Sequence, residues 1–422
     1  MVKTSRIPGF HKLTVEERVK IVKEFAGLSE DEMALLGKRG HLDIQTADRM
    51  IENVIGTFEL PFGVATNMII NGKDYLIPMV VEESSVVAGV TNAAKIARSG
   101  GGFSTSSTGP VMIAQIQAVN VSDPYGARLK LFEKRDEILE IANEQDPILI
   151  KMGGGAKDIE VRVIDTALGP MVITHLIVDT RDAMGANAVN TMAETIAPYI
   201  GEWANGRVYL RILSNLADKR LVRASVRVKR EEFKGAEDVL DGIAYAWAFA
   251  DADPYRAATH NKGIMNGISA MVIATGNDFR AIEAGAHSYA ARMGRYSSLT
   301  HWEKDHNGDL VGTIELPMAV GLIGGATKMH PLCGLVIKIL GVKTATELGE
   351  IIGAVGLCQN LAALRALAGE GIQKGHMSLH AKNIAVAAGA TGDLIDRVAQ
   401  RMIEEGKIRM DRAAELLEEL KK

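Results

Sequence analysis

The sequence predicts an α+β fold, in which a large, mainly helical domain carries an inserted ferredoxin-like domain and ends in a small helical flap. Two observations support this prediction. Between residues 111 and 213, strand-like and helix-like patterns follow one another in the order β-α-β-β-α-β, which is the ferredoxin-like order. On both sides of this segment the apolar residues mostly follow helical spacing, interrupted by glycine-rich turns.

The composition is typical of a globular protein with more than one domain. The chain has 422 residues, of which 47% are hydrophobic, so it can bury sizeable cores. Its net charge is -4 and 5% of its residues are aromatic, so neither a basic surface nor stacking platforms for nucleic acid are expected. The two cysteines, Cys333 and Cys358, lie in apolar, helix-like segments, and we interpret them as buried thiols.

The chain shows no obvious targeting or membrane segment. Its first residues lack the apolar core of a signal peptide, and no apolar run of about 18 residues stands out. We therefore expect a cytoplasmic protein that binds neither a membrane nor nucleic acid.

The first part of the large domain is expected at residues 1–109. Residues 14–55 predict helices, with capping boxes that begin at Thr14 and Ser29. Asn71-Gly72 stands between two apolar runs and predicts a hairpin turn. Residues 99–110 are rich in glycine and hydroxyl side chains, so they predict a flexible loop at a domain boundary.

The inserted domain is expected at residues 110–215, followed by the second part of the large domain at 216–371 and the C-terminal flap at 372–422. Pro124, directly after Asp123, predicts the first turn of a helix. The glycine-rich stretch 369–375 predicts a hinge before the flap. Within the insertion, strands are expected at residues 111–121, 159–164, 171–178 and 207–213, and helices at about 123–143 and 183–200.

Two segments carry candidate catalytic groups in an unusual setting. Glu83 lies in an apolar, β-branched run, where burial would raise its pKa and allow it to donate a proton near neutral pH; the alternative is a solvated glutamate at a strand edge. Lys262 lies in a run from Asp253 to Gly267 that is rich in hydrogen-bond donors and that we expect to be too polar for the core. Its ammonium could polarise a carbonyl or hold an anionic oxygen, although an exposed loop lysine would have the same surroundings.

Two further candidates are an aspartate and a histidine. Asp278 could pair with Lys262, or it could simply cap a helix at residues 279–293. His376 follows the hinge-like stretch, so it could swing into a site and protonate a leaving group. His380 lies one helical turn further, and spacing does not separate the two histidines. A zinc pair is not favoured, because no glutamate lies between them as in HExxH and no third ligand is evident, so no metal is expected.

A nucleotide site is predicted at Asp182 to Asn187, which follows a predicted strand and opens a helix. Gly185 permits close approach of the backbone, and free N–H groups at a helix start could receive a pyrophosphate. The segment is not GxGxxG, so it does not match the Rossmann pattern.

Together these segments resemble the class II 3-hydroxy-3-methylglutaryl-CoA (HMG-CoA) reductase family, and the resemblance extends over nearly the whole chain, including residues 50–61, 211–218 and 312–317. It implies reversible, two-step reduction of HMG-CoA to mevalonate and coenzyme A by two NAD(P)H. It implies that Lys262 stabilises the oxyanion, Glu83 donates a proton, Asp278 supports both, and His376 protonates the coenzyme A thiolate. The alternative hypothesis is a transferase or lyase that acts on CoA esters without redox chemistry.

The resemblance also implies binding residues and an oligomer. Asp146 matches a position that binds the adenosine ribose and would repel a 2′-phosphate, so NADH is expected over NADPH, although Lys151 and Lys157 lie nearby in sequence. A homodimer with its active sites at the interface is implied. Ser84 stands where relatives often have proline. The substrate-binding residues implied are Ser85, Asn215, Arg256, Thr259, Asn266 and Asn360, and the cofactor-binding residues are Asp146, Asp182, Met184, Gly185 and Asn187.

Overall fold

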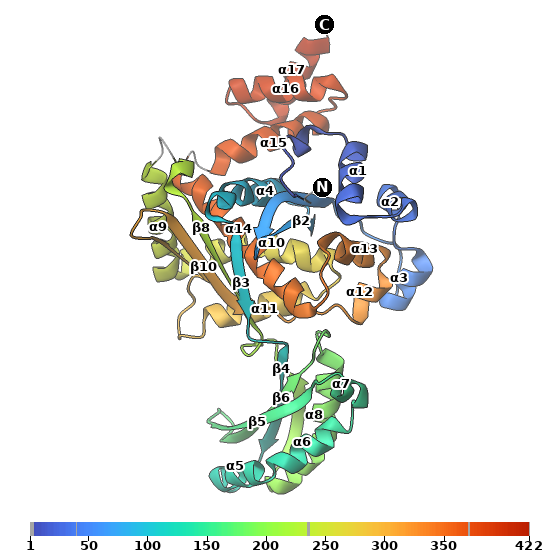
Figure 1. Cartoon of the computed structure of the whole chain (residues 1–422), viewed down its shortest axis with the longest axis vertical. Coiled ribbons are helices and arrows are strands. Elements are labelled where there is room, and N and C mark those ends of the chain that lie inside the picture. Colours follow the sequence, from blue (N-terminus) through green and yellow to red (C-terminus); the bar gives the residue numbers. More distant parts are fainter. Residues whose placement is uncertain (1–3, 39, 234–236, 370–371, 422) are drawn as a thin grey trace.

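The computed structural model describes residues 4–38, 40–233, 237–369 and 372–421, without the side chains of Glu237, Ala326 and residues 372–379. Its described part contains a six-stranded sheet surrounded by helices and a separate four-stranded sheet. Figure 1 shows the four-stranded unit at one end of the molecule and the C-terminal helices at the other. The predicted α+β class with an inserted ferredoxin-like unit is confirmed.

Three short helices follow the N-terminus, as predicted: α1 (Val15–Ala26), α2 (Glu30–Gly37) and α3 (Ile44–Met50). Both predicted capping boxes are present. At α1 the Thr14 hydroxyl accepts from the Glu17 amide at 3.2 Å, and the Glu17 carboxylate accepts from the Thr14 amide at 2.7 Å. These bonds satisfy amides that a helix start otherwise leaves unpaired.

The six-stranded sheet belongs to the large part of the molecule, and its extent exceeds what the sequence predicted. The predicted turn at Asn71 and Gly72 joins the first two strands, with φ of 49° and 76°. The strands lie in the order β2-β1-β3-β8-β10-β9. Their bounds are β1 (Phe62–Ile70), β2 (Lys73–Val80), β3 (Phe103–Ser107), β8 (Leu221–Val228), β9 (Thr300–Lys304) and β10 (Leu310–Pro317).

The prediction of a flexible loop at residues 99–110 is wrong in its centre, because β3 lies there between β1 and β8. The hydroxyl groups that suggested a loop have partners in the fold. Thr105 and Ser107 each donate to a carboxylate oxygen of Glu350 at 3.0 Å, while Phe103 is buried. Pairing with two neighbouring strands thus overrides the local composition.

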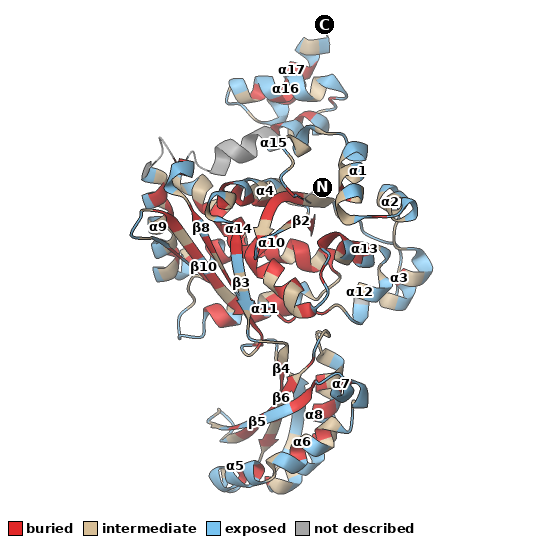
Figure 2. Ribbon diagram, in the orientation of Figure 1, coloured by how far each residue is buried: buried red, intermediate tan, exposed pale blue. Residues whose placement is uncertain are grey.

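Helix α14 (Ala345–Ala368) is the core of the large part, and it packs between α10 (Pro254–Ala274) and strands β3, β8 and β10. By length and composition alone it could cross a membrane, a feature that the sequence analysis overlooked. Most of it is buried inside the protein, however, as the red ribbon in Figure 2 shows. The other helices around it are α4 (Val86–Ala97), α9 (Glu237–Ala252), α11 (Phe279–Ala290), α12 (Gly325–Met329) and α13 (Pro331–Leu340).

Helix α10 corrects a second expectation, since residues 253–267 were expected to be too polar for the core. Asp253 caps the helix by accepting from the amides of Tyr255 and Arg256, and Pro254 occupies its first turn. The small and apolar residues between the polar ones form one buried face together with His260 and Asn261, so only part of the polar run lies on the other face of a core helix.

The four-stranded sheet has the order β5-β6-β4-β7 with antiparallel neighbours, which is the ferredoxin-like arrangement. Helices α6 and α8 contact each other and cover its strands, above buried residues such as Ile116 and Leu176. The strands are β4 (Val111–Val119), β5 (Gly155–Ile164), β6 (Met171–Asp179) and β7 (Arg207–Leu213). The helices are α5 (Pro124–Glu133), α6 (Arg135–Asn143), α7 (Pro147–Lys151) and α8 (Ala186–Trp203).

The chain ends in α15 (Ile372–Ala387), α16 (Asp393–Glu404) and α17 (Met410–Lys421). These helices share a small core of their own, which includes Val398, Met402 and Leu416. That core is separate from the main one, as expected for an appendage at the end of the chain.

Candidate active site

An ion pair joins two of the predicted catalytic residues. Glu83 lies in the turn between β2 and α4, and α10 runs past β2, so Lys262 reaches it with Nζ 2.6 Å from Oε2. The amide of Asn266, one helical turn further along α10, lies 3.4 Å from the other carboxylate oxygen. The Lys262 and Glu83 side chains are 61% and 37% exposed. Glu83 is therefore not buried, contrary to the expectation from its apolar run.

The polar face of α10 extends this site. Arg256, Thr259, Lys262 and Asn266 follow one another at intervals of three or four residues, which places them on one side of the helix. Arg256 is partly buried, and its guanidinium makes no hydrogen bond or ion pair with the residues that the structure describes. Burial lowers the pKa of this guanidinium, but the group stays charged at neutral pH. An unpaired guanidinium on this face suits a carboxylate ligand, which it can hold with two parallel bonds.

Ser85 has an unusual conformation two residues after Glu83. Its φ of 73° and ψ of -10° lie in the left-handed region, although it is not glycine. Its hydroxyl oxygen is buried without a hydrogen-bond partner among the described residues, and it makes no capping bond to α4. Backbone strain together with an unpaired buried hydroxyl indicates a group that is held ready for a ligand.

Glu83 and Ser85 both line a large cavity of about 1560 Å³. Its walls come mainly from residues 6–67, α4 and α13, and most of the lining is apolar. Three cations, Arg6, Arg18 and Lys95, also line it. The cavity can therefore take a long, partly apolar ligand with negative charges, and its edge reaches the ion pair.

Asp278 does not join the ion pair within this chain. It caps α11, where Oδ1 accepts from the amides of Arg280 and Ala281, and Oδ2 lies 3.0 Å from the Arg280 guanidinium. Lys262 and the C-terminal end of α10 are separated by about 18 Å of helix, at 1.5 Å per residue. The backbone carbonyl of Asn215 abuts Gly285 of α11, the helix that Asp278 caps.

Asn360 lies on the far side of α10 in a buried cluster that we call the His260 network: His260, Ser298, Thr300, Trp302 and Asn360. The Asn360 Oδ1 atom accepts from the Trp302 indole at 2.7 Å and from the Thr300 hydroxyl at 2.9 Å. Its Nδ2 lies 3.3 Å from His260 Nε2. Desolvation, with a smaller effect of the Arg256 charge, lowers the pKa of His260 to about 3, so the imidazole is neutral. The sequence analysis did not predict this network.

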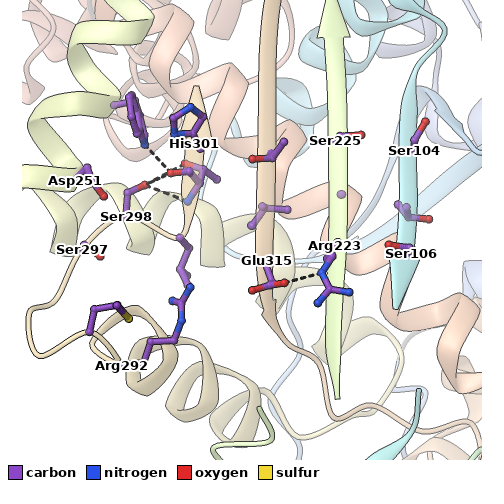
Figure 3. Close-up of a pocket in the computed structure, with 18 residues that line it drawn as sticks. Ser104, Ser106, Arg223, Ser225, Asp251, Arg292, Ser297, Ser298, His301 and Glu315 are labelled. Carbon is purple, nitrogen blue, oxygen red and sulfur yellow. Dashed lines mark hydrogen bonds and ion pairs between the residues drawn. The ribbon is translucent and has the colours of Figure 1, made fainter. Parts of the chain in front are cut away.

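A second cavity, of about 770 Å³, lies on the outer face of the six-stranded sheet. Figure 3 shows its hydroxyl-rich lining, with Ser104 and Ser106 on β3 and the pair Arg223–Glu315 across β8 and β10, 2.6 Å apart. Ser298 and Thr300 line it as well, which connects it to the His260 network. Glu83, Lys262 and Asp278 are not among its lining residues, and no motif in the sequence predicted it.

The predicted nucleotide loop lies between β6 and α8. Gly185 is the N-cap of α8 with φ of 97°, and a Cβ atom there would come 2.3 Å from the Thr180 side chain. Both the backbone conformation and the lack of space therefore require glycine at this position. Asn187 is exposed in the first helical turn. Asp182 has a structural contact as well, because its Oδ1 accepts from the Ala345 amide at the start of α14, at 2.8 Å.

The residues considered for coenzyme choice lie near α7. Asp146 caps this helix and accepts from the Leu149 amide at 2.9 Å. The ammonium of Lys157 is held by the carbonyls of Gly153 and Gly154, whereas Lys151 is exposed.

His376 falls within α15, but its side chain lies outside the described residues; His380 is exposed. Within the described ranges, no group of three or more His, Cys, Asp or Glu side chains is placed to hold a metal.

The sequence and the fold match known proteins. The family model described as hydroxymethylglutaryl-coenzyme A reductase matches residues 14–381. The chain belongs to this family. It is 62% identical to 3-hydroxy-3-methylglutaryl-coenzyme A reductase of Archaeoglobus fulgidus over 418 residues, which cover 99% of this chain and 95% of that protein.

Solved structures agree. HMG-CoA reductase from Streptococcus pneumoniae has a TM-score of 0.84 and 42% identity, covering 98% of this chain and 99% of that one. A class II enzyme from the same organism, bound to NADPH in open conformations, has a TM-score of 0.82 and 42% identity, covering 97% and 100%. The chain is therefore a class II HMG-CoA reductase homologue and an oxidoreductase that acts on a CH–OH group.

Proposed function

We propose that this enzyme interconverts (S)-HMG-CoA and (R)-mevalonate, with two NAD(P)H consumed and coenzyme A released in the reductive direction. The observation that carries the proposal is the Lys262–Glu83 pair at the edge of the large cavity, with an Nζ to Oε2 distance of 2.6 Å. The family to which the chain belongs suggests the reaction. The ion pair offers a cation and a proton carrier next to each other.

Two reductions follow one another in this proposal. The first hydride adds to the thioester carbonyl, and the developing negative charge on oxygen is stabilised by the Lys262 ammonium. Collapse of the hemithioacetal releases the coenzyme A thiolate, which His376 protonates, and leaves mevaldehyde. The second hydride adds to the aldehyde carbonyl, and Glu83 delivers the proton to its oxygen. The hydrogen bond between Lys262 and Glu83 supports these roles, because it keeps a cation and a carboxyl group close enough to act on one oxygen.

The substrate would be held by the polar face of α10 and by Ser85. Arg256 suits the free carboxylate of the hydroxymethylglutaryl group, and Thr259, Asn266 and Ser85 suit its oxygen atoms. The coenzyme A arm would occupy the large cavity, whose cations suit its phosphates. In this proposal Asn360 acts through the His260 network behind α10, because both of its polar atoms have partners there.

We further propose a homodimer in which Asp278 and Asn215 reach the Lys262–Glu83 pair of the second copy. This follows from the length of α10, because Asp278 lies beyond its C-terminal end, which is about 18 Å from Lys262 along the helix. The exposed apolar side chains Ile51 and Phe58, at the wall of the cavity, suit burial by that copy.

Mixed dimers test this arrangement. If the site is shared, a dimer of one Lys262→Ala chain and one Asp278→Ala chain keeps one complete site, so random mixing restores about a quarter of the wild-type activity. If each chain builds its own site, mixing two inactive variants restores nothing.

The cofactor would bind to residues 110–215 as a separate domain, with its pyrophosphate at the loop that includes Gly185 and Asn187. This division leaves residues 1–109 and 216–371 as the substrate domain and 372–422 as the flap. Asp146 favours NADH over NADPH in this proposal, although the similar S. pneumoniae structure holds NADPH. Asp146→Asn keeps the helix cap but removes the charge, so it should raise kcat/KM for NADPH relative to NADH. An unchanged ratio would contradict this role.

The decisive experiment is the stoichiometry with HMG-CoA as substrate. The proposal requires two reduced cofactors oxidised per coenzyme A released. A transferase or lyase would release coenzyme A without oxidising any cofactor. We propose that the reaction takes place in the cytoplasm, as expected for the soluble class II enzymes that this chain resembles.

A further inference from the structure

A buried arginine lies at the joint between the nucleotide loop and the large part of the molecule. Arg220 precedes β8, where the chain returns from the four-stranded unit, and it is 4% exposed. Its Nη1 donates to the Thr180 hydroxyl at 3.0 Å, the Ala183 carbonyl at 3.1 Å and the Met184 carbonyl at 3.3 Å. Its Nη2 donates to the Val320 carbonyl, at 2.5 Å, on the other side of the joint.

The setting of this guanidinium is costly for a residue that only fills space. Among the described residues no carboxylate accepts a hydrogen bond from it, and its partners are carbonyl groups and one hydroxyl. Burial lowers its pKa to about 10, while the charges of Asp179 and Asp182 oppose the shift, so the group is charged at neutral pH. Burying a cation among neutral acceptors costs desolvation free energy, and a positioning role would account for an arginine at this place.

The same loop meets the segment 320–323 at two more points. The Leu322 amide donates to the Asp182 carbonyl at 2.8 Å, and Ala183 forms a parallel bridge with Ile323. Gly321 presses directly on the loop, because a Cβ atom there would lie 2.4 Å from the Met184 nitrogen. The loop therefore rests on this segment with no space for a side chain between them.

The segment 320–323 also holds the turn that carries Asp278. The Gly321 amide donates to the Asn277 side chain at 2.8 Å, and Asn277 directly precedes Asp278. The Asn277 amide nitrogen in turn bonds Thr275, at the end of α10. One short strip of backbone thus contacts both the predicted nucleotide loop and the predicted catalytic turn.

We propose that Arg220 is a positioning residue for the reduction: it fixes the nucleotide loop on Val320 and so aligns the bound dinucleotide with the Asp278 turn. This inference rests on the proposed function, because it takes the loop 182–187 to be the dinucleotide site. Arg220 is too deeply buried to touch the cofactor, so it acts through Thr180, Ala183 and Met184.

Two independent variants test the joint. Arg220→Lys keeps the positive charge, but one ammonium replaces two nitrogens that face opposite sides of the joint. Gly321→Ala leaves Arg220 intact and pushes the loop away from its support. We expect both to raise Kd and KM for the reduced nicotinamide cofactor about tenfold, with less than a twofold change in KM for HMG-CoA, because a small displacement of a binding group has a large effect on alignment.

Each variant has a matched control. Arg223→Lys changes an exposed arginine three residues away, and Gly334→Ala places a Cβ atom where nothing lies within 4 Å. Both controls should leave the cofactor constants unchanged. Should Arg220→Lys fail to fold, Gly321→Ala still measures the effect of moving the loop. Thr180→Val, which removes one acceptor of Arg220, then takes the place of Arg220→Lys.

The outcomes separate this inference from the proposed function. A wild-type enzyme that neither binds nor oxidises a reduced nicotinamide, or a Gly185→Ala variant with normal cofactor binding, would remove the proposed cofactor site. A functional wild type whose Arg220 and Gly321 variants keep their cofactor Kd, or raise both KM values equally, would overturn the positioning role. An effect of Gly321→Ala without one of Arg220→Lys would assign the alignment to the backbone strip alone.

Discussion

The two faces of α10 carry polar groups of opposite character. On one face, Lys262 and Glu83 form an ion pair with 61% and 37% of their side chains exposed. On the other, two residues earlier in the chain, His260 is buried and neutral within the hydrogen bonds of Thr300 and Asn360. Nothing in the local sequence separates these faces, since His260, Asn261 and Lys262 are consecutive polar residues.

The difference shows which polar groups are available for chemistry. Most polar atoms of the His260 network bond one another, and among its described residues only His260 Nδ1 is buried without a partner, so the network stabilises the packing of α10 on α14 and β9 and offers little to a ligand. The Lys262–Glu83 pair contributes little to stability because exposed ion pairs are screened by water. We therefore expect variants of one face to change turnover and variants of the other face to change stability.

The largest effect is expected for Lys262→Ala. Loss of the cation that faces the developing oxyanion should lower kcat about a thousandfold, whereas the unfolding free energy should change by no more than about 1 kcal/mol. Lys338→Ala is the control, since it breaks an exposed ion pair with Glu32 of similar length, 2.6 Å, and neither residue lines the large cavity. Turnover numbers and thermal melts of both variants test this expectation, and a Lys262→Ala enzyme with near-normal kcat would refute it.

Asn360→Ala should have the reverse profile. It leaves the Trp302 indole N–H without its partner in the core and removes one of the partners of the Thr300 hydroxyl and of His260, which should cost about 3 kcal/mol of unfolding free energy. The folded fraction should retain kcat within about tenfold. Its neighbour Gln359 is the control, because its buried Oε1 has no partner and Gln359→Met should be close to neutral. A large loss of kcat at unchanged stability would instead place Asn360 at the substrate.

The fold was predictable where its signals are local. The ferredoxin-like unit has alternating strands, a capped helix at Pro124 and short connections, so spacing alone indicated its order. Strand β3 was not predictable, because its hydroxyl groups meet Glu350 some 245 residues later in the chain. Lys262 was placed in a polar run rather than on a core helix, since the buried face of α10 exists only after α14 packs against it.

The sequence indicated candidate residues for the site but not how they lie relative to one another. Glu83 and Lys262 are 179 residues apart, and their contact depends on β2 and α10 lying side by side. The pairing of Asp278 with Lys262 failed within one chain, and the alternative, a helix cap, describes what Asp278 does there. The left-handed conformation of Ser85 has no signal in the sequence, because serine is not typical of that region.

The pH dependence of stability gives a finer test of the buried face. Burial, and to a smaller extent the charge of Arg256, lowers the pKa of His260 to about 3 from the ordinary 6.5. Below pH 6.5 the unfolded chain thus binds a proton at His260 that the folded chain does not bind. The contribution of neutral His260 to the unfolding free energy is therefore complete above pH 6.5 and is lost as the pH falls towards 3. Between these limits the unfolding free energy of the wild type should fall by about 1.4 kcal/mol more than that of His260→Gln for each unit by which the pH is lowered. Chemical denaturation at several pH values measures both slopes, and parallel curves would show that His260 is not held neutral.

The smallest effect, and the one with the opposite sign, is expected at Ser85. Its left-handed backbone and unpaired buried hydroxyl both destabilise the folded enzyme. Ser85→Gly removes both, so it should raise the unfolding free energy by about 1 kcal/mol or less, since glycine also loses more backbone entropy on folding. KM for HMG-CoA should rise about tenfold if the hydroxyl binds the substrate. Asn71→Gly, at a left-handed turn residue away from the site, is the control and should leave KM unchanged. Greater stability together with weaker substrate binding would show that strain is kept on the reactive face of the molecule for function, whereas lower stability would show that Ser85 belongs with the supporting network.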